Sequence, residues 1–304
     1  DVEELSEYIA KGGDVTALQK GGASLLMTAA ASGQVESATL LLDSGANTEQ
    51  RDAQGRTALM YAASAGQVAT LQLLLERDAK IDARDNAGST SLIAASGANQ
   101  MATVQILLDK GAALDVMANA GWTALLTALD RSAQQPAEIN SVARLLSSRG
   151  ASLDAASDAA TQVAFRAARS GNDEVLTLLL GKGLNAKARD NAGNSLLMAA
   201  AADERLAELL IGRGLSVNDR NNAGETALMI AAGKGSLASA RLLLFTLVPA
   251  MLVGAVPAEL VRGFTWERAG LLALGAGVFF VLAGVVFYRG LRRYESGSAI
   301  QIQS

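Results

Sequence analysis

The side chains that could do chemistry in this chain are carboxylates that recur at predicted turns. Six of them are Asp52, Asp82, Asp85, Asp115, Asp190 and Asp219. Paired carboxylates can act as general acid and base, and clustered carboxylates can bind calcium. These six recur with the spacing of the turns, however, and nothing in the sequence gathers them into one pocket. We therefore predict that they form turns and that the chain has no metal site.

Missing residue types exclude most catalytic chemistry. The sequence has no cysteine and no histidine, which removes thiol nucleophiles, the usual zinc ligands and imidazole acid–base chemistry. It has no Gly-x-x-x-x-Gly-Lys-Ser/Thr phosphate loop, and its serines and threonines have no obvious activating partner. The net charge of −4 argues against a nucleic-acid partner, because phosphate binding needs a clustered basic excess. We predict a non-enzymatic protein without a cofactor.

A repeat of 33 residues organises the first four-fifths of the chain. The residues that open successive units are Gly22, Gly55, Gly88, Gly121, Ala160, Gly193 and Gly224. The first three intervals are 33 residues each, and the later ones are 39, 33 and 31. The six extra residues fall around Asp130–Asn140, where Pro136 indicates a longer loop. A tandem array with one enlarged repeat explains the spacing.

Each unit predicts two helices joined by short turns, as Gly55–Ala87 illustrates best. Thr57 is placed to cap a short helix by accepting a free backbone amide, and Gly66 can end that helix with a positive φ. In the second helix, Leu71 and Leu74 share one apolar face. The closing segment is rich in Asp, Asn and Gly, which favour a tight projecting turn.

This pattern resembles the ankyrin repeat, whose signature is Gly-x-Thr-Pro-Leu-His-x-Ala-Ala. The matching stretches are Gly22–Ala30, Gly55–Ala63, Gly88–Ser96, Gly121–Leu129, Gly193–Ala201 and Gly224–Ala232, with a degenerate copy at Ala160–Ala168. The resemblance covers about residues 1–244 and implies an all-α solenoid of about seven helix-turn-helix repeats. The family's Pro-Leu-His is replaced throughout, which removes the hydrogen bonds of that histidine.

The composition changes abruptly at residue 245, and we expect a membrane segment over residues 245–304. Residues 269–288 carry no charge and span about 30 Å as a helix, the thickness of a bilayer's hydrocarbon core. Trp266 and Tyr288 suit the two interfaces, and the basic residues of 289–304 predict a cytoplasmic tail. The alternative is a buried helix of a soluble domain. The sequence therefore predicts a solenoid followed by a transmembrane helix or a helical hairpin.

The apolar segment 242–262 and its junction with the repeats leave alternatives open. Pro249 and Pro257 favour a broken or re-entrant helix, although a kinked crossing or an interfacial helix also fits. The junction at Leu244 and Phe245 falls inside a predicted helix, whereas domain boundaries normally fall in linkers. Either the last repeat runs into a membrane anchor, or two unrelated parts have been joined.

Residues 245–304 also resemble the C-terminal end of type-2 ABC exporter permeases. The resemblance rests on Val248–Val261, the apolar run that follows it, and Tyr288–Gln301. It implies a membrane-dipping element before a last transmembrane helix that exits to the cytoplasm. The other transmembrane helices of such a permease are absent from the sequence given, so we do not expect transport by this chain alone.

A recognition surface is predicted where side chains vary between repeats while the packing positions stay fixed. In an ankyrin array, the residue after each opening glycine and the one before each Ala-Ala line a concave groove. These candidate partner-binding residues are Arg56, Tyr61, Ser89, Trp122, Thr127, Thr161, Arg166, Asn194, Glu225 and Ile230. Tyr, Trp and Arg are the types that most often anchor interfaces. For Trp122, packing against the nearby insertion is an equal alternative.

The predicted function is a membrane-anchored adaptor that binds a protein partner through this groove. The alternative is a component of an ABC-type exporter, to which the tail would belong. A hairpin in the membrane would leave the repeats on the cytoplasmic face, which we expect, whereas a single span would place them outside.

Overall fold

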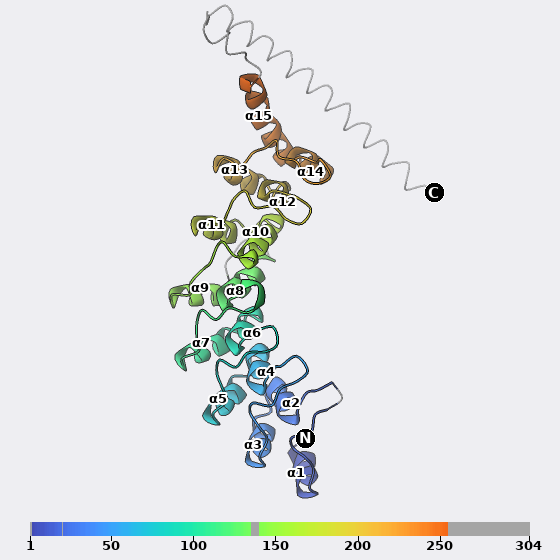
Figure 1. Ribbon diagram of the computed structural model, residues 1–304, viewed down its shortest axis with the longest axis vertical. Helices are drawn as coiled ribbons and strands as arrows, with labels where there is room; N and C mark the ends of the chain where they lie inside the picture. Colours follow the sequence, from blue (N-terminus) through green and yellow to red (C-terminus); the bar gives the residue numbers. More distant parts are fainter. Residues whose placement is uncertain (1, 20, 135–139, 255–304) are drawn as a thin grey trace, which may run out of the picture. The chain divides into compact units, whose positions relative to one another are not determined.

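The computed structural model describes residues 2–19, 21–134 and 140–254, and these residues confirm the predicted all-α fold (Figure 1). The chain divides into two units, Asp1–Phe245 and Thr246–Ser304, and the repeats make up the first. Extended pairing within the described residues is limited to two isolated bridges, Leu18 with Ser24 and Arg189 with Ser195.

Seven helix pairs follow one another in the repeat unit. The first helices of the pairs are α2 (Leu25–Ser32), α4 (Ala58–Ala65), α6 (Ser91–Gly97), α8 (Ala124–Ala133), α10 (Asp158–Ser170), α12 (Leu196–Ala199) and α14 (Ala227–Gly233). The second helices are α3 (Val35–Asp43), α5 (Val68–Glu76), α7 (Met101–Asp109), α9 (Ser141–Ser148), α11 (Asp173–Gly181), α13 (Glu204–Gly212) and α15 (Leu237–Gly254). Helix α1 (Val2–Ala10) precedes them and packs on α3, as the second helix of an earlier repeat would.

The core lies between stacked helices of neighbouring repeats. First helices contact first helices along the whole series from α2 to α14, and second helices contact one another from α1 to α9 (Figure 1). Small side chains allow the close approach, since Ala62 and Ala63 are completely buried. Leu71 and Leu74 of α5 are also completely buried, as their shared face predicted. Each repeat therefore shields its apolar face only through its neighbours.

Helix caps follow the prediction with one correction. Gly66 ends α4 in the left-handed conformation with φ 74°, and its amide N–H reaches back to the last carbonyls of the helix. At the starts of three other first helices, a threonine hydroxyl accepts a hydrogen bond from a backbone amide; these residues are Thr90, Thr123 and Thr226. The prediction for Thr57 was wrong, because its side chain makes no capping hydrogen bond and its buried hydroxyl has no hydrogen-bond partner.

Methionine stands where the family's signature has histidine in four repeats, at Met27, Met60, Met198 and Met229. Met27 and Met198 recover part of the histidine's hydrogen bonding. The amide N–H of Ser24 donates to Sδ of Met27 at 3.3 Å, and that of Ser195 donates to Sδ of Met198 at 3.5 Å. The serine hydroxyls accept in return from the amides of the same methionines. A thioether is a weak acceptor, but both methionines are buried, so the reciprocal cap also packs the helix start.

The turns between repeats are joined by an arginine that occupies the same position in several units. Arg51 donates to the carbonyl of Gly55 in its own turn and to that of Arg84 in the next repeat. Arg84 makes the same pair of contacts with Gly88 and Met117, and Arg189 makes them with Gly193 and Arg220. We call this contact pair an arginine staple. In both copies of the Arg-Asp-Asn-Ala-Gly sequence, the arginine therefore joins its own turn to the turn of the next repeat by hydrogen bonds.

Two first helices depart from the regular length. Helix α10 begins at Asp158, two residues before Ala160, the residue that replaces the opening glycine of the repeat. In the other repeats, the first helix begins three residues after that glycine, following a projecting turn. Helix α12 has only four residues and ends at the C-cap Ala200, in a repeat that is two residues shorter than the 33-residue period.

Helix α15 carries the chain from the last repeat into the apolar segment. It continues through Pro249 to Gly254, where the described residues end. Between Leu242 and Gly254 the chain is a continuous helix, without the expected break. The rest of the expected broken or re-entrant segment, 255–262, lies outside the described residues. Among the described residues, none of the helices has the length and apolar character needed to cross a bilayer. The expected transmembrane helix 269–288 and the tail 289–304 lie outside the described residues.

Candidate partner-binding surface

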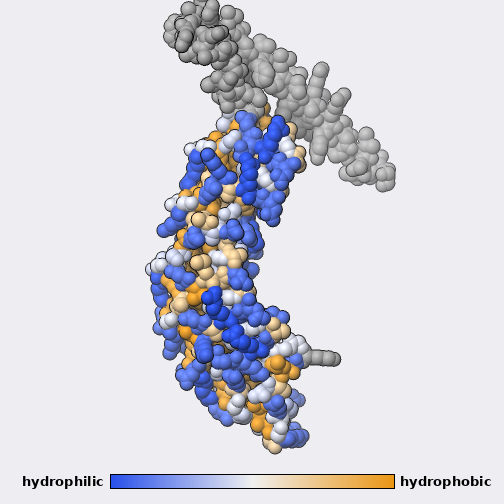
Figure 2. Space-filling model, in the orientation of Figure 1, coloured by the Kyte–Doolittle hydropathy of each residue, from blue (hydrophilic) through white to orange (hydrophobic). Residues whose placement is uncertain are grey.

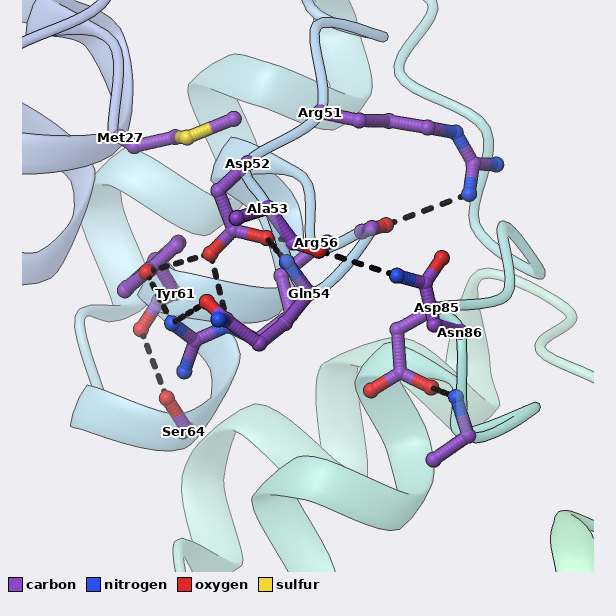
Figure 3. Close-up of polar contacts among 12 residues, drawn as sticks. Met27, Arg51, Asp52, Ala53, Gln54, Arg56, Tyr61, Ser64, Asp85 and Asn86 are labelled. Carbon is purple, nitrogen blue, oxygen red and sulfur yellow. Dashed lines mark hydrogen bonds and ion pairs between the residues drawn. The ribbon is translucent and has the colours of Figure 1, made fainter. Parts of the chain in front are cut away.

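Two of the predicted anchors belong to one polar cluster in the second repeat. Asp52, whose side chain is only 1% exposed, accepts from Nε of Arg56 and from the hydroxyl of Tyr61, both at 2.8 Å (Figure 3). Arg56 also donates to the Tyr61 hydroxyl, and its guanidinium lies 4.6 Å from the centroid of the tyrosine ring. Each of the two half-buried anchors is therefore held in one orientation by the buried carboxylate.

The electrostatics of this cluster favour the charged form of Asp52. Burial raises the pKa of Asp52, but hydrogen bonds from the Arg56 amide, the Tyr61 hydroxyl and the Arg56 side chain outweigh it and lower the pKa below its usual value. Burial and the hydrogen bond to Asp52 raise the pKa of Tyr61. The hydroxyl of Tyr61 thus stays protonated and remains a hydrogen-bond donor to the carboxylate.

The predicted residues of the middle repeats are less available. The amide of Ser89 donates to the Asp85 carboxylate within its turn. Thr127 is half-buried and donates its hydroxyl to the carbonyl of Thr123. Trp122 is half-buried and packs against the core. Because residues 135–139 of the insertion lie outside the described residues, the two alternatives for Trp122 stay open.

Arg166 projects from α10 and is held by a buried carboxylate of the preceding repeat. Its Nη1 atom forms an ion pair with Oδ2 of Asp130, whose side chain is 13% exposed. Burial raises the pKa of Asp130, and the charge of Arg166 and a hydrogen bond from Gln134 offset this only in part. The second oxygen of Asp130 is buried without a hydrogen-bond partner.

A continuous chain of polar contacts links the last three repeats. Arg169 of α10 donates to Oδ2 of Asp190 at 2.6 Å, and Asp190 also accepts from the side chain of Asn194. Asn221 then donates to Asn194 at 2.9 Å and to Glu225 at 3.0 Å. Burial raises the pKa of Asp190, but hydrogen bonds from the Asn194 side chain and amide, the Ala192 amide and Arg169 outweigh it and lower the pKa.

Two adjoining hollows lie over this chain of contacts. The first, of about 690 Å³, lies between α10 and the turn before α12, and Thr161, Arg166 and Arg169 line it. The second, of about 580 Å³, lies between that turn and α14, and its lining includes Asn194, Glu225 and Ile230. Arg169 and Ala192 line both hollows. The structure thus brings five of the predicted residues to one groove over α10, α12 and α14.

Arg169, Asp190, Asn221 and Met229 line this groove or order it and were not among the predicted site residues. Arg169 lies one helical turn after Arg166, a spacing that could have indicated it. Met229 occupies a position that is buried in the preceding repeats, with Met60 3% and Met198 2% exposed, yet it is itself 54% exposed. No sequence pattern marks that difference, because it depends on what covers the last helix.

The turn carboxylates have the structural roles that were predicted. Asp52, Asp85 and Asp190 each accept two backbone amides of their own turns. Asp82 and Asp115 accept an amide from the following repeat, and Asp219 pairs with Arg189. Across the described ranges, no group of three or more carboxylates could hold a metal ion.

The described surface mixes hydrophilic and hydrophobic side chains, as the visible face in Figure 2 shows. Stacked helix pairs, stitched turns and a groove over the first helices define a class of helical-repeat protein that presents a surface to macromolecules. The family model described as "Ankyrin repeats (3 copies)" matches residues 2–85 and 164–248, more than half of the chain. The chain belongs to the ankyrin-repeat family, which indicates protein–protein interaction as its general role. No curated protein matches the chain.

A solved relative supports the same fold. The crystal structure of the human ASB11 ankyrin repeat domain is similar over 73% of this chain and 97% of its own length, with a TM-score of 0.57 and 24% sequence identity. At this identity, the similarity concerns the fold alone. The matched residues of the family model end at 248, so the permease-like interpretation of the tail receives no support from it.

Proposed function

We propose that this chain is a non-enzymatic adaptor that binds a protein partner through the groove over α10, α12 and α14. The observation that carries the proposal is the meeting of two hollows at Arg169, with the predicted Arg166, Asn194 and Glu225 around them. The polar groups there are already oriented by neighbouring side chains, so little conformational entropy is lost when they bind.

Site-specific photo-crosslinking in the native host tests this function. A photoreactive residue is placed at Gln162, which is exposed at the groove, and at Glu208, which is exposed on the second helix α13. We expect a crosslinked protein adduct from position 162 and none from position 208. Equal adducts at both positions, or none at position 162, would contradict binding through the groove.

The predicted Arg56 and Tyr61 form a further contact candidate in the same proposal. They lie in the second repeat, outside the two hollows, and the ion pair with Asp52 orders them. If the partner extends that far along the array, a photoreactive residue at Gln54 should give the same adduct as position 162. An adduct of different mass would separate the two surfaces.

Membrane attachment is proposed from the sequence alone, through residues 269–288, which lie outside the described residues. The specific observation is the twenty-residue run without a charge. We expect the full chain to stay in the membrane fraction during alkaline extraction and a chain ending at Leu244 to be released. A reporter fused at Asp1 that is active in the cytoplasm would support the proposed cytoplasmic face, and an inactive one would contradict it.

A further inference from the structure

The fifth repeat lacks the projecting turn that the others have. Elsewhere, the chain makes a turn that ends at the opening glycine before the first helix, and in four repeats this turn has the sequence Asp/Asn-x-x-Gly, as at Asp52–Gly55 and Asp190–Gly193. The corresponding residues, 157–160, instead start α10, and the hydroxyl of Ser157 caps the helix at the amide of Ala160. The first turns of α10 therefore lie open beside the next turn, where the hollow of about 690 Å³ is found. We call this hollow the repeat-5 notch.

Two arginines project into the notch from one face of α10. Arg166 and Arg169 are three residues apart, and their side chains are 43% and 52% exposed. Among the described residues, each guanidinium donates to a single carboxylate oxygen, Arg166 through Nη1 and Arg169 through Nη2. A guanidinium has five N–H donors, so each arginine retains donors toward the open hollow.

The carboxylates behind these arginines hold them in place. Asp130 and Asp190 have side chains only 13% and 15% exposed, so they are less accessible to a ligand than the guanidinium groups are. Arg169 also lies 5.8 Å from the ring centroid of the buried Phe165. The notch thus presents two pre-ordered guanidinium groups, each paired with the carboxylate behind it, and Asp158 and Arg189 also line it.

The second hollow adds an apolar neighbour to this cationic site. It meets the notch at Arg169 and contains Met229, which is 54% exposed, and the half-buried Ile230. An extended polypeptide lying along the groove would pass from the two arginines to this apolar surface. The order of the two surfaces sets the order of residue types that the groove fits.

Building on the proposed function, we propose that the repeat-5 notch is a subsite for a carboxylate side chain of the partner. The Asp or Glu of an extended segment accepts hydrogen bonds from the outward N–H groups of Arg166 and Arg169, and an apolar side chain of the same segment lies on Met229. Two guanidinium groups fixed in advance suit the two oxygens of a carboxylate, because bidentate arginine contacts to carboxylates are strong and directional.

A randomised display library of short extended peptides, selected against the purified full chain, provides the probe. We expect enrichment of Asp or Glu beside Leu, Ile or Met. The test variant is Arg166→Lys with Arg169→Lys, which keeps both charges and their carboxylate partners but removes the planar donors. It should bind the selected peptides at least tenfold more weakly.

A matched control makes the same chemical change elsewhere. Arg77→Lys with Arg149→Lys alters two arginines that pair with Asp43 and Asp109 and line neither hollow. This variant should bind the peptides as the parent does, and equal circular dichroism and melting would show that both variants fold.

Three results would overturn the subsite. They are enrichment without an acidic position, equal affinity of the parent and the Arg166/Arg169 variant, and the absence of any selected peptide. If the library yields only non-acidic peptides while position 162 still gives its crosslinked adduct with the native partner, the subsite is contradicted and the proposed function stands. A missing adduct at position 162 would remove the proposed function itself.

Discussion

Asp52, Asp130 and Asp190 have side chains that are 1%, 13% and 15% exposed and each pairs with an arginine, yet their environments differ. Asp52 and Asp190 accept hydrogen bonds at both carboxylate oxygens, whereas one oxygen of Asp130 has no partner. Full satisfaction lowers the pKa of the first two, and burial with incomplete satisfaction raises that of Asp130. Arginine pairing alone therefore does not decide whether a buried charge stabilises the fold.

Asp52→Asn should destabilise the protein at pH 7. The side-chain oxygen of asparagine can still accept the turn amides, as Asn221 does in its own turn, but its amide group cannot accept from Arg56 and Tyr61. We expect a loss of about 1–2 kcal/mol in the free energy of unfolding, measured with urea. Asp85→Asn is the control, since Asp85 holds its turn through Oδ1, and it should change stability by less than half as much. Equal losses would show that the Arg56–Tyr61 contacts add nothing.

Asp130→Asn and Asp190→Asn should respond to pH in opposite directions. A raised folded pKa means that the stability Asp130 contributes is present at low pH and is lost as the pH rises through that pKa. Relative to the parent, the free energy of unfolding of Asp130→Asn should therefore increase as the pH rises from 3 to 7. Because its pKa is lowered in the folded state, Asp190 contributes stability above its unfolded pKa of 3.8, and this stability is lost on acidification. Relative to the parent, the free energy of unfolding of Asp190→Asn should therefore decrease as the pH rises from 3 to 7. Urea unfolding at several pH values measures both, and shifts of the same sign would contradict the assignment.

Among the elements, neighbouring turns are joined by the arginine staples in addition to the hydrogen bonds within each turn. A staple joins the carbonyls of two successive turns, so it couples neighbouring repeats outside their helix packing. Met117 and Ala156 occupy the arginine position in the fourth and fifth repeats, so the series of staples is interrupted there.

Arg84→Met should cost more stability than Arg220→Met. Arg84 bonds to Gly88 in its own turn and to Met117 in the next repeat, whereas Arg220 bonds only to Gly224 of its own turn among the described residues. We expect a loss of about 1 kcal/mol for the first variant and about half of that for the second. Hydrogen exchange of the amides in turn 85–88 should also speed up in the first variant. Identical costs would mean that the contact between repeats contributes nothing.

The regular elements were predictable, and the irregular ones were not. Helix α4 was expected over residues 58–65 and is found there, because Gly66 ends it and the alanines fix its packing. The early start of α10 was missed, since a helix cap at Ser157 and the missing glycine at Ala160 give no periodic signal. Because the early start of α10 was not predicted, part of the site was not predicted either. Arg166 was found from its place before Ala-Ala, while the role of Arg169 depends on the notch that the early start opens.

For the whole repeat unit, stability depends on neighbours. A repeat in the interior of the array is covered on both sides. In the last repeat, by contrast, the first helix α14 contributes only Ala227 and Ala231 to the buried core. Interface terms between adjacent repeats dominate the stability of such arrays, so an uncovered repeat opens first.

Met60→Ala and Met229→Ala test this gradient at equivalent positions of two repeats. Met60 is 3% exposed, and its truncation should leave a cavity and cost about 2–4 kcal/mol. Met229 is 54% exposed, and its truncation should cost well under 1 kcal/mol. Thermal or urea unfolding of the two variants measures the difference. Similar losses would indicate that the last helix is covered in solution.

The interruption of the staples also determines how the array would respond to force. When the repeat unit is stretched from its two ends, each stapled pair of turns has contacts that must rupture together with the helix packing. Between the turns that carry Arg84 and Arg189, Met117 and Ala156 offer no such reinforcement. Tension should therefore part the α8–α10 region first, leaving two shorter blocks that remain folded and can reclose when the load is released.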